Sequence, residues 1–551
     1  MMDNQVQSMM WLRRLSMTNY RKFGGRFSAD ANSNGGHSDS MVPGLTVDFD
    51  RQMTVLVGEN GAGKTAVLDA AAVALGTFLK AFPEVSGLRI QGSDARRKYY
   101  SQYGETDIQE QFPVSIYAQA DIAQPVQWRT VQERGNPIAV PIEWRRELNS
   151  ANGSTTFSKA SQICSLSEMY QKLVQMDPDA VLPLLAYYGT DRLGLHGRMT
   201  GKARASAFKN RFRGYDRCLQ SSLNYRQMDA WWRKQYDRSL RGYDVPTYRA
   251  VCKTVERCLE TLLRENGHAT EARLEYDFDD GLRLSYTDSD GVRLESMPLW
   301  TLSDGYRGVV GLVSDIAWRI AALNPFMGDS VIDWTPGVVL IDEVDLHLHP
   351  KWQSCILGVL MKSFPQIQFI VTTHAPMVIS SVASDRLRVI TLDDKNDGIY
   401  QAVSPRNETY GSSASLVLRH VMGSLDKPRK VQDLFDRFSR QMDADEFPEA
   451  KQTLGELERT IGADNPDLSG ARSSYFFYAG SEGLMLYVDK DNAHPPSIEI
   501  AKAKRVLKNT DGVEVCYDSL GQLQEASQLI PTCGIVWAPI RDGCAFTACG
   551  V

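Results

Sequence analysis

The feature that most constrains this chain is a run of eight residues: Gly58, Glu59, Asn60, Gly61, Ala62, Gly63, Lys64 and Thr65. The run matches the phosphate-loop pattern GxxxxGK[ST], and it lies between an apolar stretch, 53–57, and a helix-like stretch, 66–75. Glycines let backbone N–H groups approach phosphate oxygens, and the following helix points its positive end at them. The run therefore predicts a nucleotide site in which Lys64 reaches the β- and γ-phosphates and the Thr65 hydroxyl ligates Mg²⁺.

Composition limits the classes of protein that this chain can belong to. Its 551 residues can form two to four domains, and a net charge of −6 gives no overall basic character for nucleic-acid binding. No apolar run approaches the roughly 20 residues needed to cross a bilayer, and residues 1–12 do not resemble a signal peptide. Nine scattered cysteines without CxxC pairs suit reduced thiols. We therefore expect a cytoplasmic protein without a membrane contact.

Strands and helices alternate along the chain before the second group of motifs. Residues 11–57 predict an N-terminal β-meander with a Gly/Ser/Asp/Asn-rich loop at 24–40. A continuous apolar run at 183–189 predicts a buried strand, and the spacing of apolar residues from 229 to 264 predicts two helices. Asp280-Gly281 and Asp290-Gly291 are typical of hairpin turns, so a second meander is expected there.

Residues 190–217 are locally basic. This stretch is either a contact for nucleic acid or a partner protein, or an ordinary solvated loop and helix face. Its cationic residues are Arg192, Arg198, Lys202, Arg204, Lys209, Arg211, Arg213 and Arg217, against Asp191 and Asp216.

A short turn, 302–307, opens a predicted helix at 309–323. Ser303 is a suitable N-cap residue, Asp304 follows it, and Gly305 lets the backbone approach an anion. Taken alone, this pattern is weak and also fits a common helix cap.

Two further strands end in polar residues. Strand 338–341 ends in Asp342 and Glu343, where an acidic pair lies beside the glycine loop in doubly wound folds. We expect Asp342 to hold Mg²⁺ and Glu343 to orient and deprotonate the attacking water. Strand 369–373 is followed by His374, which is expected to contact the γ-phosphate or that water.

Other polar residues are weaker candidates. Gln91 is predicted to approach the metal ion and the γ-phosphate. His347 and His349 have the spacing of two metal ligands, but interface or packing roles are favoured because no further His or Cys lies nearby.

Five motifs follow one another along the chain in an order that resembles the ABC-type ATPases of the RecF, SMC and OLD class. They are the glycine loop, the signature at 302–305, the strand that ends in 342–343, the loop at 345 and His374. The resemblance implies an α/β ABC-type P-loop ATPase head, a mixed β-sheet flanked by helices, with a helical insertion and a C-terminal accessory region. It also implies a head-to-tail homodimer in which Ser303, Asp304 and Gly305 of one chain act on ATP held by the other. Gln91 stands where the family has its Q-loop, and 19–23 resembles the family's segment near the adenine.

Three stretches, 183–189, 302–307 and the helical tail from 410, resemble PtuA-type ATPases of Septu and retron anti-phage systems. The resemblance implies an HNH nuclease partner and, in the retron case, a reverse transcriptase with its DNA–RNA product. Two other functions stay open, an OLD-like nuclease with its own metal site and a DNA repair or chromosome-structure ATPase. The expected segments are an N-terminal ATPase lobe (1–190), a helical insertion (191–270), a C-terminal ATPase lobe (271–400), a helical tail (401–478) and a partner-docking segment (479–551).

The last segment contains two groups of polar residues that could be sites. Glu482 with Asp489 and Asp491 resembles a TOPRIM nuclease centre, but only six residues separate Glu482 from Asp489. A second group could bind zinc, although no pair has ligand spacing, so chance placement is favoured. This second group comprises Cys533, Cys544, Cys549 and His494.

Overall fold

The computed structural model describes residues 9–27, 41–83, 85–102, 105–193, 211–265, 271–287, 291–293, 295–393, 397–423 and 427–479, and four short strands beyond them. The chain forms two compact units, 1–423 and 424–551. Each unit is described by itself below. No helix in the described parts of the chain is long and apolar enough to cross a membrane.

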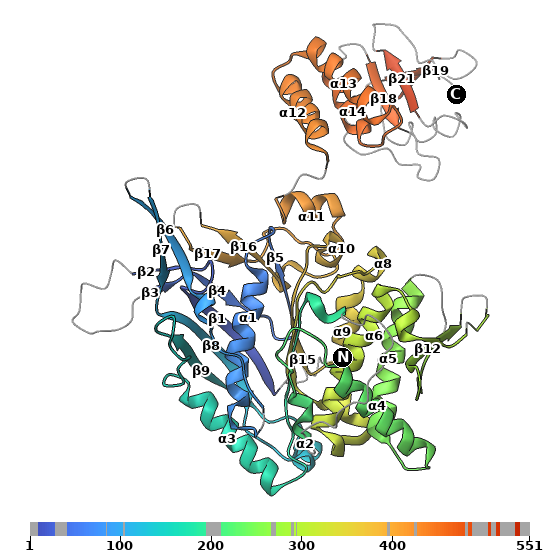
Figure 1. Cartoon of the computed structure of the whole chain (residues 1–551). Helices are drawn as coiled ribbons and strands as arrows, with labels where there is room; N and C mark the ends of the chain where they lie inside the picture. Colours follow the sequence, from blue (N-terminus) through green and yellow to red (C-terminus); the bar gives the residue numbers. More distant parts are fainter. Residues whose placement is uncertain are drawn as a thin grey trace. The chain divides into compact units, whose positions relative to one another are not determined.

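A six-stranded sheet forms the centre of the first unit (Figure 1). Five strands are parallel and the edge strand β17 is antiparallel, so the sheet is mixed, as predicted. The four strands at 53–57, 184–188, 337–341 and 367–372 are buried along their whole length, which agrees with their largely apolar sequences. In spatial order the strands are β10 (Leu184–Tyr188), β14 (Gly337–Ile341), β15 (Ile367–Thr372), β5 (Met53–Val57), β16 (Leu387–Leu392) and β17 (Tyr400–Val403).

A second, antiparallel sheet covers one side of helix α1 (Lys64–Leu75), which contacts β8 of this sheet and β14 and β15 of the central sheet. The predicted N-terminal meander is therefore divided, because β5 leaves its neighbours and joins the central sheet. The order of the second sheet is β4 (Leu45–Asp48), β1 (Met10–Thr18), β8 (Val114–Ala123) and β9 (Ala139–Leu148). Two smaller hairpins are β2 (Gly25–Phe27) with β3 (Met41–Pro43) and β6 (Arg96–Gln102) with β7 (Glu105–Gln111).

The two helices predicted between 229 and 264 are confirmed as α4 (Tyr225–Leu240) and α5 (Pro246–Glu265). Trp231 and Trp232 are buried, and α5 packs against α6 (Asp304–Leu323) and α9 (Ile356–Ser363). A three-stranded sheet follows α5, with β11 (Glu271–Asp277), β12 (Gly281–Thr287) and β13 (Met297–Pro298).

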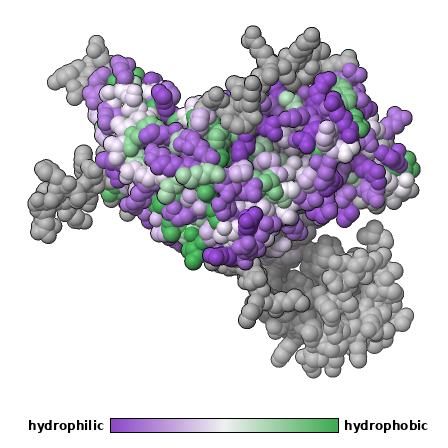
Figure 2. Space-filling view, turned by 90° about the horizontal axis from the view of Figure 1, so that it is seen from below, coloured by the Kyte–Doolittle hydropathy of each residue, from purple (hydrophilic) through white to green (hydrophobic). Residues whose placement is uncertain are grey.

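Shorter helices complete the first unit. The α-helices are α2 (Trp128–Arg134), α3 (Ser161–Met176), α7 (Val331–Trp334), α8 (Pro350–Gln353), α10 (Pro376–Ile379) and α11 (Ala414–His420). The 3-10 turns are η2 (Gly76–Ala81), η3 (Gly92–Asp94), η4 (Thr190–Leu193), η5 (Arg211–Tyr215), η6 (Leu299–Thr301), η7 (Pro325–Ser330) and η8 (Ser384–Arg386). In the face of the molecule shown in Figure 2, the coloured residues are mainly hydrophilic, and hydrophobic ones lie in scattered patches. Scattered apolar residues of this kind are normal on a protein surface.

The second unit has its own small core between three helices, α12 (Arg429–Asp443), α13 (Phe447–Ile461) and α14 (Leu468–Ala479). Its strands pair as β18 (Gly483–Tyr487) with β21 (Ile535–Pro539) and β19 (Arg505–Lys508) with β20 (Glu514–Tyr517). The boundary at 423/424 falls inside the predicted tail 401–478. The TOPRIM-like and zinc candidates, Glu482, Asp489, Asp491, His494, Cys533, Cys544 and Cys549, lie outside the described residues.

Candidate functional site

The glycine loop takes the shape that its pattern requires. Gly61 and Gly63 have φ values of 79° and 99°, which are left-handed and favour glycine. A Cβ on Gly63 would lie 2.5 Å from the Phe23 ring, so this position also needs glycine for space. Helix α1 begins at Lys64, directly after the loop, so the N–H groups of its first turn have no partner within the helix. This end of the helix is therefore suited to an anion.

The Lys64 side chain contacts the backbone of the glycine loop. Its Nζ donates hydrogen bonds to the carbonyl oxygens of Gly58 at 2.9 Å and Glu59 at 3.1 Å. Burial lowers the pKa of Lys64, and the nearby carboxylates of Asp342 and Glu343 oppose this effect. The loop thus holds a cation close to the carboxylates at the end of β14.

The ends of β14, β15 and the start of α1 meet at one edge of the central sheet. Thr65 Oγ1 donates to Asp342 Oδ2 at 2.9 Å, and Thr372 Oγ1 donates to Asp342 Oδ1 at 2.6 Å. Asp342 is only 5% exposed. A carboxylate and a hydroxyl in contact are the kind of oxygen donors that Mg²⁺ prefers, so this pair fits the predicted metal ion.

Glu343 follows Asp342 in a left-handed backbone conformation, with φ 46°. Its N–H donates to Thr372 Oγ1 at 2.8 Å. His374 is half-buried two residues beyond Thr372. Burial, and next the positive charge of Lys64, lower the pKa of His374, while Glu343, Asp345 and Asp342 act in the other direction. These shifts favour a neutral imidazole, which can both donate and accept a hydrogen bond.

The signature turn, which we define as residues 303–305, lies at the start of α6. Ser303 is at the N-cap position, but its side chain makes no capping hydrogen bond. Ser303 and Asp304 are exposed, whereas Gly305 is buried and a Cβ there would lie 2.8 Å from the His347 carbonyl oxygen. In the described residues, no hydrogen bond or ion pair joins this turn to the glycine loop.

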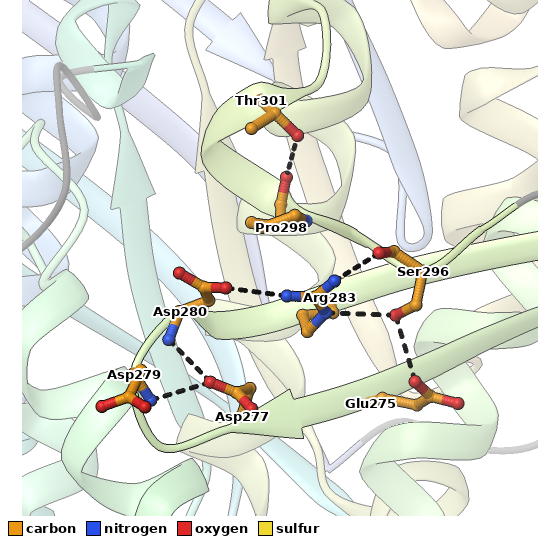
Figure 3. Close-up of polar contacts among 8 residues, drawn as sticks. All are labelled: Glu275, Asp277, Asp279, Asp280, Arg283, Ser296, Pro298 and Thr301. Carbon is orange, nitrogen blue, oxygen red and sulfur yellow. Dashed lines mark hydrogen bonds and ion pairs between the residues drawn. The ribbon is translucent and has the colours of Figure 1, made fainter.

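The segment that leads into the signature turn is tied to the three-stranded sheet (Figure 3). Arg283 of β12 donates to Asp280 Oδ2 at 2.7 Å and to Ser296 Oγ at 3.3 Å. The Ser296 hydroxyl in turn donates to Glu275 Oε2 at 3.0 Å, and Thr301 Oγ1 donates to the Pro298 carbonyl at 2.7 Å. These contacts hold the chain on both sides of β13, immediately before α6 begins.

Gln91 is engaged in local structure. Its backbone N–H donates to Asp94 Oδ2 at 2.9 Å, and its backbone carbonyl accepts from the Asp94 N–H at 3.0 Å. Asp94 also accepts from Arg21 Nε at 3.0 Å, and Arg21 Nη1 donates to Asp69 of α1 at 2.6 Å. No hydrogen bond among the described residues links Gln91 to Thr65 or Asp342, and its role at the metal site stays a prediction.

The surface interpretation of the basic stretch is wrong for Arg192, which is buried, whereas Arg211 is half-buried. Arg192 is 3% exposed and donates to the carbonyl oxygens of Asp342 and Glu343. Arg211 donates to the carbonyl oxygens of Leu323, Pro178 and Ala180. Buried carbonyl groups need donors, and here the two arginines supply them from within the chain. Residues 194–210, with Arg198, Lys202, Arg204 and Lys209, lie outside the described part of the chain.

Three residues that contact the site's backbone or loop were missed at the level of sequence. Thr372 bridges Asp342 and Glu343, and its position as a polar residue at the end of an apolar strand was a usable signal. Lys22 donates to the Gly61 carbonyl and lies 4.4 Å from the centre of the Tyr400 ring. Arg192 was noticed only as one charge in a basic stretch, because no pattern in the sequence shows that it points inward.

The exposed histidines differ in their contacts. His349 Nδ1 accepts from the Lys351 N–H at 3.3 Å and so caps α8. His347 has a left-handed backbone, with φ 60°, and its carbonyl faces Gly305. In the parts of the chain that the structure describes, no group of three or more His, Cys, Asp or Glu side chains is arranged to hold a metal ion.

Comparisons with known proteins agree with this site. A family model described as "AAA domain" matches residues 14–237, and one described as "AAA domain, putative AbiEii toxin, Type IV TA system" matches residues 276–380. The chain is 25% identical to the Retron Vc95 probable ATPase of Vibrio cholerae serotype O1 biovar El Tor, over 69% of this chain and 76% of that protein. It is 25% identical to the Retron Ec83 probable ATPase of Escherichia coli, over 77% and 82%.

Over a shorter stretch the chain is similar to a Septu protein PtuA of Bacillus mycoides (strain KBAB4), with 31% identity over 25% of this chain and 18% of that protein. Among solved structures, an SMC head bound to the C-winged helix domain of ScpA has a TM-score of 0.41 at 15% identity, covering 72% of this chain and 98% of that one. The predicted resemblance to PtuA-type and retron ATPases is confirmed by the sequence matches. The two AAA-domain matches and the similarity to two probable ATPases support ATPase activity for this chain.

Proposed function

We propose that this ATPase closes as a head-to-tail homodimer around ATP and Mg²⁺ and thereby regulates a separate nuclease in an anti-phage system. The observation that carries the proposal is the grouping of Lys64, Thr65, Asp342 and Glu343 at one edge of the central sheet. A phosphate-binding loop beside an acidic strand end is suited to hydrolysing a nucleoside triphosphate.

Each residue at this edge has a separate task in the proposed reaction. The N–H groups of 60–65 and the Lys64 ammonium bind the phosphates, and His374, held neutral, contacts the γ-phosphate or the attacking water. Glu343 accepts the proton of that water as it attacks. Thr65 and Asp342 would hold Mg²⁺, which supplies Lewis-acid stabilisation of phosphate charge when it is bound.

The signature turn supports the dimer. Ser303 and Asp304 are exposed at the positive end of α6, and the Ser303 hydroxyl makes no capping bond within its own chain. A helix N-terminus with free donors is suited to the phosphates of a nucleotide held by a second chain. Residues 303–305 of one chain would therefore complete the site formed by Lys64 of the other.

The role in defence rests on the relatives, whose names place them in retron and Septu systems. The proposed partner is an HNH nuclease, joined in a retron setting by a reverse transcriptase and its DNA–RNA product. In this proposal ATP controls the contact with the nuclease, so a slow turnover would be sufficient.

Glu343→Gln tests the chemistry. The variant keeps the shape of the side chain but cannot accept a proton, so ATP binding should persist while hydrolysis falls by about 10²–10⁴-fold. Single-turnover phosphate release measures the loss, and size-exclusion chromatography with ATP should show a trapped dimer. Normal turnover would remove Glu343 from the role of base.

Purification from the native operon tests the partner. A tagged chain should bring down an HNH-family protein, and Glu343→Gln with ATP should change the amount recovered. A chain that is recovered alone, from an operon without an HNH gene, would contradict the regulatory role.

A further inference from the structure

Arg192 lies directly behind the proposed catalytic glutamate. It belongs to η4, just beyond the end of β10, and its guanidinium is buried. Nη1 donates to the carbonyl oxygens of Gly189 at 2.9 Å and Asp342 at 2.6 Å, and Nη2 donates to the carbonyl oxygen of Glu343 at 2.5 Å. One rigid fork therefore joins the end of β10 to the two residues that follow β14.

The carbonyl groups of residues 342 and 343 lie on either side of the two backbone bonds whose rotations are φ and ψ of Glu343. They can point at one guanidinium because consecutive carbonyls point in similar directions in helical conformations of either hand, and Glu343 has φ 46°. A left-handed conformation costs a non-glycine residue about 1–2 kcal/mol, so it needs contacts that maintain it. Arg192 supplies them on the carbonyl side, and Thr372 accepts the Glu343 N–H on the other side.

The Glu343 side chain has little else to orient it. Within the described residues, no hydrogen bond or ion pair is formed by its carboxylate. Its direction is therefore set by the backbone conformation from which it projects. A change of φ and ψ at 343 would swing the carboxylate away from the water that it has to meet.

We propose that Arg192 is a positioning residue for ATP hydrolysis, which holds Glu343 in its left-handed conformation and so aims the catalytic carboxylate. The proposal rests on the role of Glu343 given above. Lysine could not replace this arginine, because its single ammonium lacks the planar fork that spans several carbonyls. Tyr225 Oη donates to the Arg192 carbonyl at 3.3 Å and helps to hold η4 in place.

Arg192→Lys and Arg192→Gln test the proposal in the full-length chain. Because a misplacement of about 1 Å can reduce a rate about 10²-fold, we expect kcat to fall by about 10- to 100-fold in both variants. The Kd for ATP should stay within about threefold, since the glycine loop does not touch Arg192. Combined with Glu343→Gln, either substitution should change the residual rate by less than about twofold, because the carboxylate it positions is already gone.

Arg211→Lys is the matched control. Arg211 is half-buried and also donates to three backbone carbonyls, but those belong to residues 178, 180 and 323 and not to the site. Burial lowers the pKa of both guanidinium groups, and both substitutions replace an arginine that donates to backbone carbonyls. Arg211→Lys should lower the unfolding temperature and leave kcat within about twofold of wild type.

The outcomes separate the two proposals. Three results would overturn the positioning role while Glu343 stays the base. They are a wild-type kcat in both Arg192 variants, an equal loss of kcat when Arg192 is substituted in the Glu343→Gln background, and a kcat loss that Arg211→Lys matches. If neither Arg192 variant folds, the residue is structural and the positioning role also fails. Wild-type turnover in Glu343→Gln alone would overturn the proposed base, whatever the arginine variants do.

Discussion

The two halves of the proposed nucleotide site, the glycine loop and the signature turn, use their polar groups in opposite ways. In the glycine loop, Lys64 donates to two carbonyls of its own loop and Thr65 donates to Asp342. In the signature turn, Ser303 makes no capping bond, and both Ser303 and Asp304 are exposed. The first half is assembled within one chain, whereas the second is presented outward, which is the arrangement that a site shared between two chains requires.

Helix α6, which begins at the signature turn, is anchored further along by buried hydrogen bonds. Asp315 of α6 accepts hydrogen bonds from Tyr188 Oη at 2.8 Å, Trp318 Nε1 at 2.7 Å and Arg319 Nε at 2.7 Å. Arg319 also donates to the Gly214 carbonyl at 2.9 Å. A buried network therefore holds the helix, while Ser303 and Asp304 at its start stay exposed.

Asp315→Asn should have the largest effect. It leaves the Arg319 guanidinium buried without a carboxylate, which typically costs about 3–5 kcal/mol. Urea unfolding followed by tryptophan fluorescence measures the change in free energy of unfolding. The control is Asp304→Asn, since the ion pair of Asp304 with Arg307 is exposed on the acid side and such pairs are worth less than about 1 kcal/mol. Equal losses in the two variants would mean that the buried network does not anchor α6.

Lys64→Ala should weaken ATP binding to the isolated chain. A hydrogen bond to a charged group is worth about 1.5–3 kcal/mol, so the Kd should rise by about 10- to 100-fold or more. Isothermal titration calorimetry measures the affinity. Unchanged affinity would show that the glycine half does not depend on its lysine.

Ser303→Ala should have a smaller effect, and it should lower the rate of hydrolysis without lowering the affinity for ATP. A neutral hydrogen bond contributes about 0.5–1.5 kcal/mol, so hydrolysis should fall by about 2- to 10-fold. The Kd of the isolated chain for ATP should not change, because residues 303–305 would contact only the nucleotide of the other chain. A weakened Kd in the monomer would place the turn in the site of its own chain.

A mixing experiment sharpens this comparison. A Lys64→Ala chain keeps its signature turn, and a Ser303→Arg chain keeps its glycine loop. In a two-fold dimer of both, one site combines the two defects and the other has neither, so random mixing should restore about a quarter of wild-type activity. No recovery would contradict the shared site.

The smallest expected effect is on the pH dependence of stability. The pKa of His374 is lowered from 6.5, chiefly by burial, so the folded chain binds fewer protons than the unfolded chain just below pH 6.5. Stability should therefore fall as the pH drops below 6.5, and His374→Gln should lose less over the same range. Thermal unfolding from pH 7.5 to 5.5 measures both, and parallel curves would show that His374 is not perturbed.

The strands and helices that surround the site were predictable because their sequences carry strong, local signals. The strands β5, β10, β14 and β15 are nearly continuous apolar runs, and burial along their whole length explains why. The stretch 77–150 is polar and interrupted in the sequence, yet it contains β8 and β9. In β8, buried and half-exposed residues alternate, so polar side chains interrupt the apolar run by which a strand is recognised in the sequence.

The sequence alone determined the glycine loop, the acidic pair and the histidine, because each is a short pattern whose chemistry depends on adjacent residues. Only the tertiary structure decided how Arg192 and Gln91 are used. A guanidinium and an amide can serve a surface, a cap or a backbone, and the choice depends on which carbonyl or N–H groups the fold leaves buried beside them. Arg192 meets the carbonyls at 342 and 343 because parallel strands from distant parts of the chain end side by side, which no local pattern records.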